Sequence, residues 1–156
     1  DVCSSDLGHN DIMKLLVDAK ADANAKDRAG TTSLMAASAR GHFDVVSTIL
    51  AAGANVNAQN ADGQTALMFA YNGKNQVQSL WEQYNQFLEE ASKTGEEPDE
   101  FIEDHNDTGP IIEEALKDHT ELVDLLLKNG ADETLKDKKG RVAKDFGVNA
   151  DLFSEL

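Results

Sequence analysis

Apolar residues recur along most of the chain in groups spaced three and four residues apart, which is the spacing of one face of an α-helix. Polar stretches rich in Gly, Asp and Asn separate these groups, as is typical of turns. Short helices joined by turns are therefore predicted. Their apolar faces are Ile12, Met13, Leu16 and Val17; Leu34, Ala36, Ala37 and Ala39; Val45, Val46, Ile49 and Leu50; Val77, Leu80, Trp81, Tyr84, Phe87 and Leu88; Ile111, Ile112, Ala115 and Leu116; and Leu122, Val123, Leu126 and Leu127.

The pattern also repeats as a whole, with a period of about 33 residues. A shift by one period moves Gly30, Thr32, Leu34, Met35 and Ala37 onto Gly63, Thr65, Leu67, Met68 and Ala70. A shift by 77 residues moves His42, Val46, Leu50, Gly53 and Ala54 onto His119, Val123, Leu127, Gly130 and Ala131. Because 77 is two periods plus 11, one unit in between is expected to carry an insertion.

The G-x-T-x-L, G-H and G-A-x-x-N motifs at this period resemble the ankyrin repeat. The resemblance implies an all-α solenoid of stacked helix-turn-helix pairs, joined by finger loops that are similar to β-hairpins. It covers residues 8–146, and a C-terminal tail follows at 147–156. The expected units are a partial one at 8–26, a complete one at 27–59, a divergent one at 60–103, another at 104–136 and a partial cap at 137–146.

The divergent unit departs from the pattern after Gly73. Its apolar positions from Val77 to Leu88 predict one amphipathic helix of about 17 residues, long enough to overrun the stack. Residues 89–107 hold nine acids and one lysine, and they are expected to form an inserted acidic loop. The next unit is predicted to have Pro110 at the start of a first helix over 111–116, and a second helix over 122–127.

The first seven residues, Asp-Val-Cys-Ser-Ser-Asp-Leu, do not follow the period. They resemble a translated reading frame of a sequencing adapter, joined to the chain at Gly8, and a divergent natural end is the alternative. In the first interpretation Cys3 has no functional role. The natural N-terminus, with any targeting signal, is then expected to be missing.

Charge limits the classes of partner. The chain of 156 residues has a net charge of −15, from 29 acids and 14 bases. This argues against nucleic acid and anionic membrane surfaces, because binding to either depends on basic residues. No apolar run approaches the ~18 residues of a membrane-spanning helix, and a single cysteine excludes an intrachain disulfide. We expect an intracellular, cytoplasmic and monomeric protein.

Residues with potential chemistry do not form a catalytic pattern. The chain lacks a spacing typical of a nucleophile with its base, a phosphate-binding loop and an HExxH motif, so neither an enzyme nor a cofactor is expected. Glu113 and Glu114 are adjacent in a predicted helix and point about 100° apart. His105 stands among acids, but the calcium-loop pattern is absent, so no metal site is expected.

The resemblance implies a protein–protein interaction module that binds across the concave face of fingers and first helices. The contact positions flank the finger glycine or end the first helix. They are Arg28, Ala29, Thr31, Ala39, Arg40, Ala61, Asp62, Gln64, Asn72, His105, Asn106, Thr108, Leu116, Lys117, Lys138, Lys139 and Arg141. The alternative is a regulatory fragment of a larger enzyme or channel.

Two further groups of residues are given structural interpretations. His9, His42 and His119 share one position of the repeat, where the resemblance implies a histidine that bonds neighbouring turns. The aromatic residues of the long helix are expected in the core, and an exposed anchor for a partner is the alternative. They are Trp81, Tyr84 and Phe87.

Overall fold

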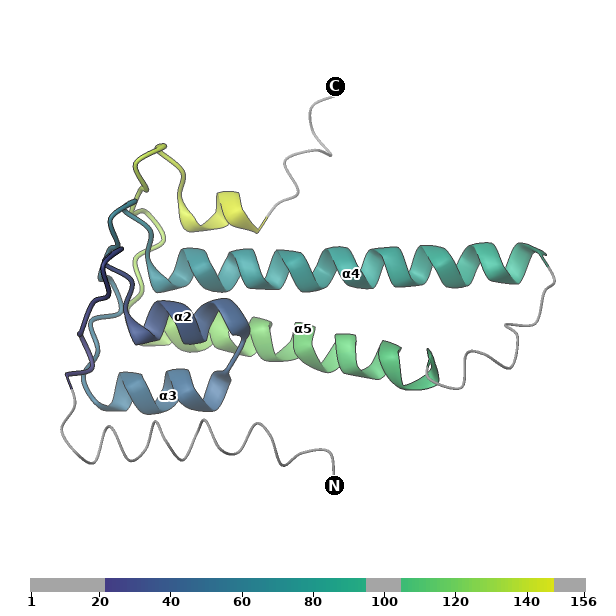
Figure 1. The fold of residues 1–156 in the computed structure, drawn as a ribbon, viewed down its shortest axis with the longest axis horizontal. Coiled ribbons are helices and arrows are strands. Elements are labelled where there is room, and N and C mark those ends of the chain that lie inside the picture. Colours follow the sequence, from purple (N-terminus) through teal and green to yellow (C-terminus); the bar gives the residue numbers. More distant parts are fainter. Residues whose placement is uncertain (1–21, 95–104, 148–156) are drawn as a thin grey trace.

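A computed structural model describes residues 22–94 and 105–147 of the chain (Figure 1). Its helices are α2 (Ser33–Arg40), α3 (Phe43–Ala51), α4 (Ala66–Thr94) and α5 (His105–Lys128), followed by the 3-10 helix η3 (Ala143–Phe146). The predicted all-α fold is confirmed, and the β-structure of the described part is one isolated bridge between Lys26 and Thr32. The predictions for the first seven residues and for the helix that contains Ile12 lie outside the described residues.

Local signals set the ends of α2. The Thr32 hydroxyl accepts a hydrogen bond from the N–H of Met35 at 3.3 Å, which caps the start of the helix. Gly41 ends the helix with a φ of 75°, a left-handed conformation that residues with a Cβ adopt less readily. The chain turns at this glycine, and α3 begins at Phe43.

The corresponding turn is missing from the next unit. One period after Gly41 the chain has Lys74, and α4 continues through this position. With 29 residues, α4 is about 43 Å long, whereas α2 has only 8 residues. The predicted overrun of the stack is confirmed. The predicted start of the long helix after Gly73 is wrong, because lysine does not favour the left-handed turn and the helix already begins at Ala66.

α5 is continuous as well. The two helices predicted at 111–116 and 122–127 are one helix, so that prediction is wrong. The physical reason is again the missing turn glycine, because Asp118 takes the place of Gly41 under the longer shift. Pro110 is not at the start of the helix but inside it, five residues after His105. Parts of the predicted acidic loop, residues 89–94 and 105–107, are also helical.

The long helices α4 and α5 run alongside the shorter α2 and α3 (Figure 1). α2 packs beside α4, α3 packs beside α5, and η3 covers the other side of α4. The core lies between these elements. Its apolar side chains with at most 1% exposure are Leu34, Met35, Val46, Ile49, Ala66, Leu67, Met68, Ala70, Leu122, Leu126 and Ala143.

α4 and α5 continue together beyond the ends of α2 and α3, on the side of the molecule away from the fingers (Figure 1). We call residues 74–94 and 105–118 the hairpin extension, and the remaining described residues the stack. Within the extension, a Cβ on Gly109 of α5 would lie 3.1 Å from Cε1 of Tyr84 in α4. Glycine therefore allows the two helices to approach each other closely at this point.

Candidate partner-binding site

Three finger loops fold by the same side-chain interaction. Asp27, Asn60 and Asp137 stand at equivalent positions, because one period separates the first two and the longer shift separates the last two. A side-chain oxygen of each accepts hydrogen bonds from the backbone N–H groups two and four residues further along, at 2.8 to 3.0 Å. Asp and Asn stabilise tight turns in this way, so each finger tip has its shape set locally.

The three fingers stack on one another through backbone hydrogen bonds. The N–H of Ala61 donates to the carbonyl oxygen of Ala29 at 2.8 Å. The N–H of Lys138 donates to the carbonyl oxygen of Asp62 at the same distance. The second finger therefore lies between the first and the third, and the tips form one continuous surface.

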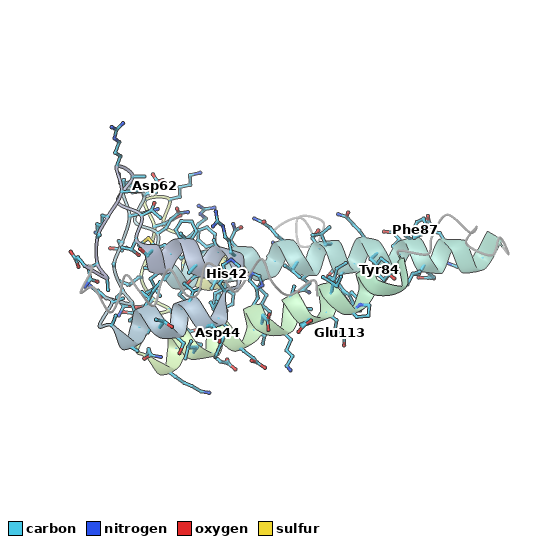
Figure 2. The ribbon with its side chains drawn as sticks, turned by 60° about the horizontal axis from the view of Figure 1, so that its bottom comes forward. His42, Asp44, Asp62, Tyr84, Phe87 and Glu113 are labelled. Atoms are coloured by element: carbon cyan, nitrogen blue, oxygen red, sulfur yellow. The ribbon has the colours of Figure 1, made fainter. Side chains whose placement is uncertain are left out.

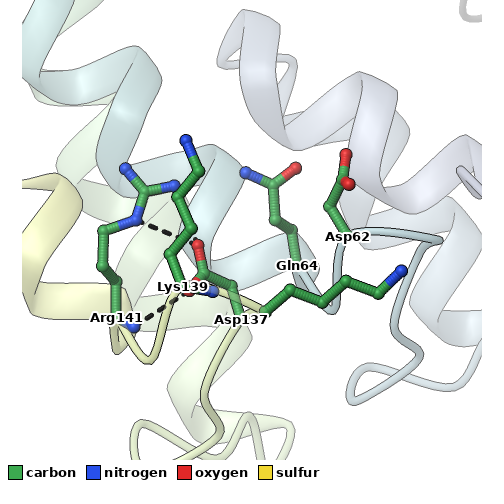
Figure 3. A pocket seen from close by; sticks show the side chains of 6 residues that line it. Asp62, Gln64, Asp137, Lys139 and Arg141 are labelled. Atoms are coloured by element: carbon green, nitrogen blue, oxygen red, sulfur yellow. Dashed lines mark hydrogen bonds and ion pairs between the residues drawn. The ribbon is translucent and has the colours of Figure 1, made fainter.

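A hollow of about 180 Å³ lies between the second and third finger tips (Figure 3). Three cationic and two acidic side chains meet there. The lining residues are Asp62, Gln64, Asp137, Lys138, Lys139 and Arg141. Lys138 and Lys139 are exposed, and neither forms an ion pair with another described residue.

Arg141 is held at the hollow from two directions. Its Nε and Nη2 atoms donate to Oδ2 of Asp137 at 2.9 and 2.8 Å (Figure 3). Its guanidinium carbon lies 4.3 Å from the centre of the Phe146 ring, in a cation–π contact. Burial raises the pKa of the Asp137 carboxyl, but hydrogen bonds from Arg141 and Lys139 outweigh burial and leave the pKa below its ordinary 3.8. Asp137 is therefore an anion that positions Arg141.

The structure brings most of the predicted contact residues to the fingers and the first-helix layer. The finger residues among them are Arg28, Ala29, Thr31, Ala61, Asp62, Gln64, Lys138, Lys139 and Arg141. Ala39 and Arg40 end α2, and Asn72 occupies in α4 the position of Ala39. The side chains of Arg28, Arg40 and Asn72 are exposed.

The remaining predicted contact residues do not lie in a finger. Three of them belong to the first turn of α5, and their side chains are outside the described part: His105, Asn106 and Thr108. Leu116 and Lys117 lie in the middle of α5, and Lys117 is paired with Glu121 at 3.8 Å. The prediction that these residues surround a separate fourth finger and first helix is wrong, because α5 has no break here.

The two described histidines of the shared repeat position have different surroundings. His42 precedes α3 and is exposed, and its side chain makes no capping hydrogen bond. His119 is buried within α5, and its Nδ1 atom lies 2.9 Å from the carbonyl oxygen of Ala115. The His119 ring fills the space that Gly41 and Gly73 leave by having no Cβ. A structural role fits His119, but its hydrogen bond is within one helix rather than between turns.

For the aromatic residues of the long helix, the sequence analysis expected a place in the core and gave exposure as the alternative. Trp81 and Tyr84 are half-buried and stacked on each other, with ring centres 6.0 Å apart. Phe87 is 49% exposed, so its predicted place in the core is wrong. Figure 2 shows Phe87 far along the extension, at the opposite end of the molecule from Asp62 on the finger. The seven-residue spacing of Leu80 and Phe87 was the signal available in the sequence.

Comparison with known proteins matches residues 2–91 to ankyrin repeats, in three copies. This match covers more than half of the chain and ends within α4, ahead of α5 and the third finger. No curated protein matches the chain. Within the part that the structure describes, no helix is both long and apolar enough to cross a membrane. The same residues contain no group of three or more His, Cys, Asp or Glu that could hold a metal ion.

Proposed function

Since the chain belongs to the ankyrin-repeat family, we propose that it binds another protein across the surface of its finger tips and first helices. Ankyrin repeats are in general protein–protein interaction modules and are typically non-catalytic. A repeat array offers such a surface because successive units present equivalent positions side by side. The contact residues in the proposal are those of the three fingers together with Arg40 and Asn72.

The observation that carries this proposal is the stacking of the fingers. Backbone hydrogen bonds within and between the tips satisfy the polar main chain, which leaves the side chains at the tips exposed for recognition. Arg28 on the first finger and Lys138 and Lys139 on the third are exposed and have no ion pair with another described residue. A surface with rigid backbone and uncommitted cationic side chains favours binding with a small loss of conformational entropy.

The hollow indicates what the partner presents at this point. Asp137 and Phe146 hold the guanidinium of Arg141 in one orientation. Arginine binds carboxylates through a planar set of donors, and a held side chain loses less freedom on binding. We expect an Asp or Glu side chain of the partner to approach the hollow between Lys138, Lys139 and Arg141. The net charge of −15 attracts cationic partners as a whole at longer range. The hollow is expected to contact a single acidic side chain of such a partner.

The test is a triple substitution, Arg28→Ala with Lys138→Ala and Lys139→Ala. Arg141 is left in place because its bonds with Asp137 also hold the third finger. The matched control replaces three cationic residues of the long helices, Lys93, Lys117 and Lys128, by alanine, so that the change in net charge is the same. Both variants should melt at nearly the same temperature as the parent, because all six side chains are exposed.

Each protein is immobilised and used to capture partners from a cell lysate, with quantification by mass spectrometry. We expect the parent and the control variant to retain the same proteins, and the finger variant to lose them by about tenfold or more. If the finger variant retains these proteins at an undiminished level, the finger surface is not the binding site.

A further inference from the structure

The row of stacked fingers ends at the third finger, which lies uppermost in Figure 1. Each of the first two fingers contacts the finger that follows it through the same set of atoms. The third finger, residues 136–141, has the equivalent atoms, but no further finger follows it among the described residues. We call the side of residues 136–141 that faces away from the second finger the open edge.

The first of these atoms is a backbone carbonyl oxygen near the finger tip. The carbonyl oxygens of Ala29 and Asp62 each accept a hydrogen bond at 2.8 Å from an N–H of the next finger. The repeat shifts place Lys139 at the same position of the third finger. The carbonyl oxygen of Lys139 accepts no hydrogen bond from another described residue. It is therefore a backbone acceptor of the kind that an added segment of chain can pair with.

The second feature is a side chain that reaches forward to the next finger. Lys26 donates from Nζ to the carbonyl oxygen of Gln59 at 3.0 Å. Gln59 in turn donates from Nε2 to the carbonyl oxygen of Lys136 at 3.2 Å. Lys136 is the third member of this series, and its side chain is exposed and forms no ion pair with another described residue. The open edge therefore has a cationic donor as well as a backbone acceptor.

Glycines mark the place where the backbone of the next finger lies. A Cβ on Gly30 would lie 3.1 Å from the backbone nitrogen of Ala61, and a Cβ on Gly63 would lie 3.2 Å from that of Lys138. The next finger therefore needs the space that a side chain at this position would fill. Gly140 is the equivalent glycine of the third finger, and a Cβ there meets no atom of a described residue within 4 Å. The open edge thus has room for one more segment of backbone.

The second and third fingers show the shape that such an edge accepts. Each brings a tight turn of four residues, 60–63 and 137–140, that starts with Asn or Asp and ends with Gly. The carbonyl oxygen just before the turn accepts the side-chain hydrogen bond from the preceding finger. The N–H of the second turn residue donates the backbone hydrogen bond. An occupant of the open edge needs the same turn, because this spacing pairs with Lys136 and Lys139 at once.

The charge of the third finger indicates the side chains of that turn. Residues 136–141 contain four cations and one acid, and the acid, Asp137, is already paired with Arg141. Residues 59–64, on which the third finger stacks, contain one acid and no cation. A cationic finger therefore packs on an acidic one on its inner side. An acidic turn is attracted to the open edge in the same way.

We propose that the open edge binds a loop of a partner protein, and that this loop is an acidic tight turn of the form Asp/Asn-x-x-Gly. The loop accepts a hydrogen bond from the Lys136 side chain, donates one to the Lys139 carbonyl oxygen and lies over Gly140. A second copy of this chain is disfavoured, because residues 26–31 of its first finger contain two cations and one acid. The open edge is not the finger-tip surface, and this proposal does not rest on the function proposed for that surface.

The probe is a cyclic peptide of about ten residues that displays the turn Asn-Glu-Asp-Gly, because cyclisation holds the turn in its bound shape. A control peptide displays Asn-Lys-Lys-Gly in the same ring. Each peptide is added to the whole isotope-labelled chain, and NMR follows the backbone amide signals. We expect the acidic peptide to shift the signals of residues 139–141, and to do so less as the salt concentration rises. The basic peptide should leave these signals unchanged.

A matched pair of glycine variants locates the binding. Gly140→Asn places a side chain where the loop would lie and should abolish the shifts. Its control is Gly130→Asn, because the two glycines have φ values of 81° and 85°, a conformation that asparagine tolerates better than most residues. Gly53 is the equivalent of Gly130 in a unit that has a following finger, and a Cβ there also meets no atom of a described residue within 4 Å. Gly130→Asn should therefore bind the peptide as the parent does.

A second pair of variants tests the side-chain donor. Lys136→Ala removes one hydrogen bond to the loop and should weaken the acidic peptide by about fivefold. Lys136→Gln should retain most of the binding, because Gln59 forms the equivalent hydrogen bond in the second finger. Lys136 is exposed, so circular dichroism should show a folded protein in both cases.

Several results would overturn the proposal. The first is an equal response of Gly140→Asn and Gly130→Asn to the acidic peptide, and the second is the absence of any response in the parent. Shifts confined to Asp62 and Gln64 would place the peptide in the hollow between the fingers instead. Sedimentation that shows a dimer of the parent, lost in Gly140→Asn, would assign the open edge to a second copy of the chain.

Discussion

The stack and the hairpin extension contain the same two long helices in different surroundings. In the stack, α4 lies among α2, α5 and η3, and its Leu67 is fully buried. In the extension, α4 runs beside α5 beyond the ends of the shorter helices, and Leu80 is 55% exposed (Figure 1). One continuous helix thus passes from a packed environment into a largely solvated one.

This difference shows that the burial of an apolar side chain in a repeat array depends on the neighbouring units, and not only on the apolar residues of its own helix. Both halves of α4 carry apolar residues at helical spacing. Among the described elements, only the first half has α2 on one side and η3 on the other, because a unit in an array contacts the units before and after it. The extension consequently is expected to contribute less stability for each residue, and its Leu80 and Ile111 side chains stay largely exposed.

The largest expected effect comes from truncating the same residue type in the two regions. Leu67→Ala in the stack removes a fully buried side chain and should lower the free energy of unfolding by about 2–5 kcal/mol. Leu80→Ala, in the same helix, should change it by less than about 0.5 kcal/mol. Urea denaturation measures both. Equal losses would show that the extension is packed as tightly as the stack.

A second comparison uses the two glycines that lie inside the long helices. A Cβ on Gly73 would lie 2.5 Å from the backbone oxygen of Ala39, which cannot move aside easily. Gly73→Ala should therefore cost about 1–3 kcal/mol of unfolding free energy, more than the improvement of about 1 kcal/mol in helix propensity. Gly109→Ala meets a side chain instead of backbone, the ring of Tyr84 at 3.1 Å, and should cost less. Thermal melting of the two variants would contradict this if Gly109→Ala were the more damaging.

The third prediction concerns the response of the stack to acid. Because the pKa of Asp137 is lower in the folded protein than its ordinary 3.8, the carboxylate stabilises the fold above that value. This stabilisation is lost as the pH falls through the lowered pKa. Asp137→Asn should remove the contribution, so the melting temperature of the variant should fall less than that of the parent between about pH 5 and about pH 3.

The natural control for this substitution is already in the chain. Asn60 occupies the same position in the second finger, where its amide oxygen accepts the same two backbone hydrogen bonds. The Asp137→Asn variant should therefore keep the shape of the third finger and lose only the charge. Identical acid profiles of variant and parent would show that the ion pair with Arg141 does not contribute to stability.

The smallest effect is expected at the far end of the extension. Lys93 and Glu89 form an ion pair at 2.7 Å, but their side chains are 67% and 68% exposed. Solvent screens such pairs, so Lys93→Ala should change the unfolding free energy by no more than about 0.5 kcal/mol. A melting curve measures the change. A loss well above this value would show that the Lys93–Glu89 ion pair stabilises the end of α4 more than its exposure to solvent predicts.

The sequence allowed the stack to be predicted because its turns and caps depend on a few residues that recur. Thr32 and Thr65 each accept a hydrogen bond from the N–H three residues later, and the repeat period found both. The expected contact residues around Arg28, Asp62 and Lys138 lie at the three stacked fingers, because the repeat period also locates the finger turns. The hollow at Arg141 could not be predicted, because it depends on how the second and third fingers pack together.

The predictions around 104–117 were wrong for a reason that the sequence itself contains. Lys74 and Asp118 replace the turn glycine found at Gly41, and without glycine the two helices continue. Assuming a separate fourth unit placed Lys117 at the end of a first helix, when it lies in the middle of α5. The sequence left both a buried and an exposed Phe87 open and favoured the buried one, because an apolar stripe does not show whether a neighbouring helix packs against it.

The stacking of the fingers has a consequence for the entropy of the chain. The hydrogen bond from Ala61 to Ala29 closes a segment of nearly one period, and the bond from Lys138 to Asp62 closes a segment more than twice as long. For a flexible chain, this difference in closure entropy is only about 0.8 kcal/mol, because the cost grows with the logarithm of length. α4 and α5 are consecutive helices that run out and back, so the inserted residues return the chain to the third finger. An ankyrin array can therefore accept a long insertion between the two helices of a pair while its fingers keep their register.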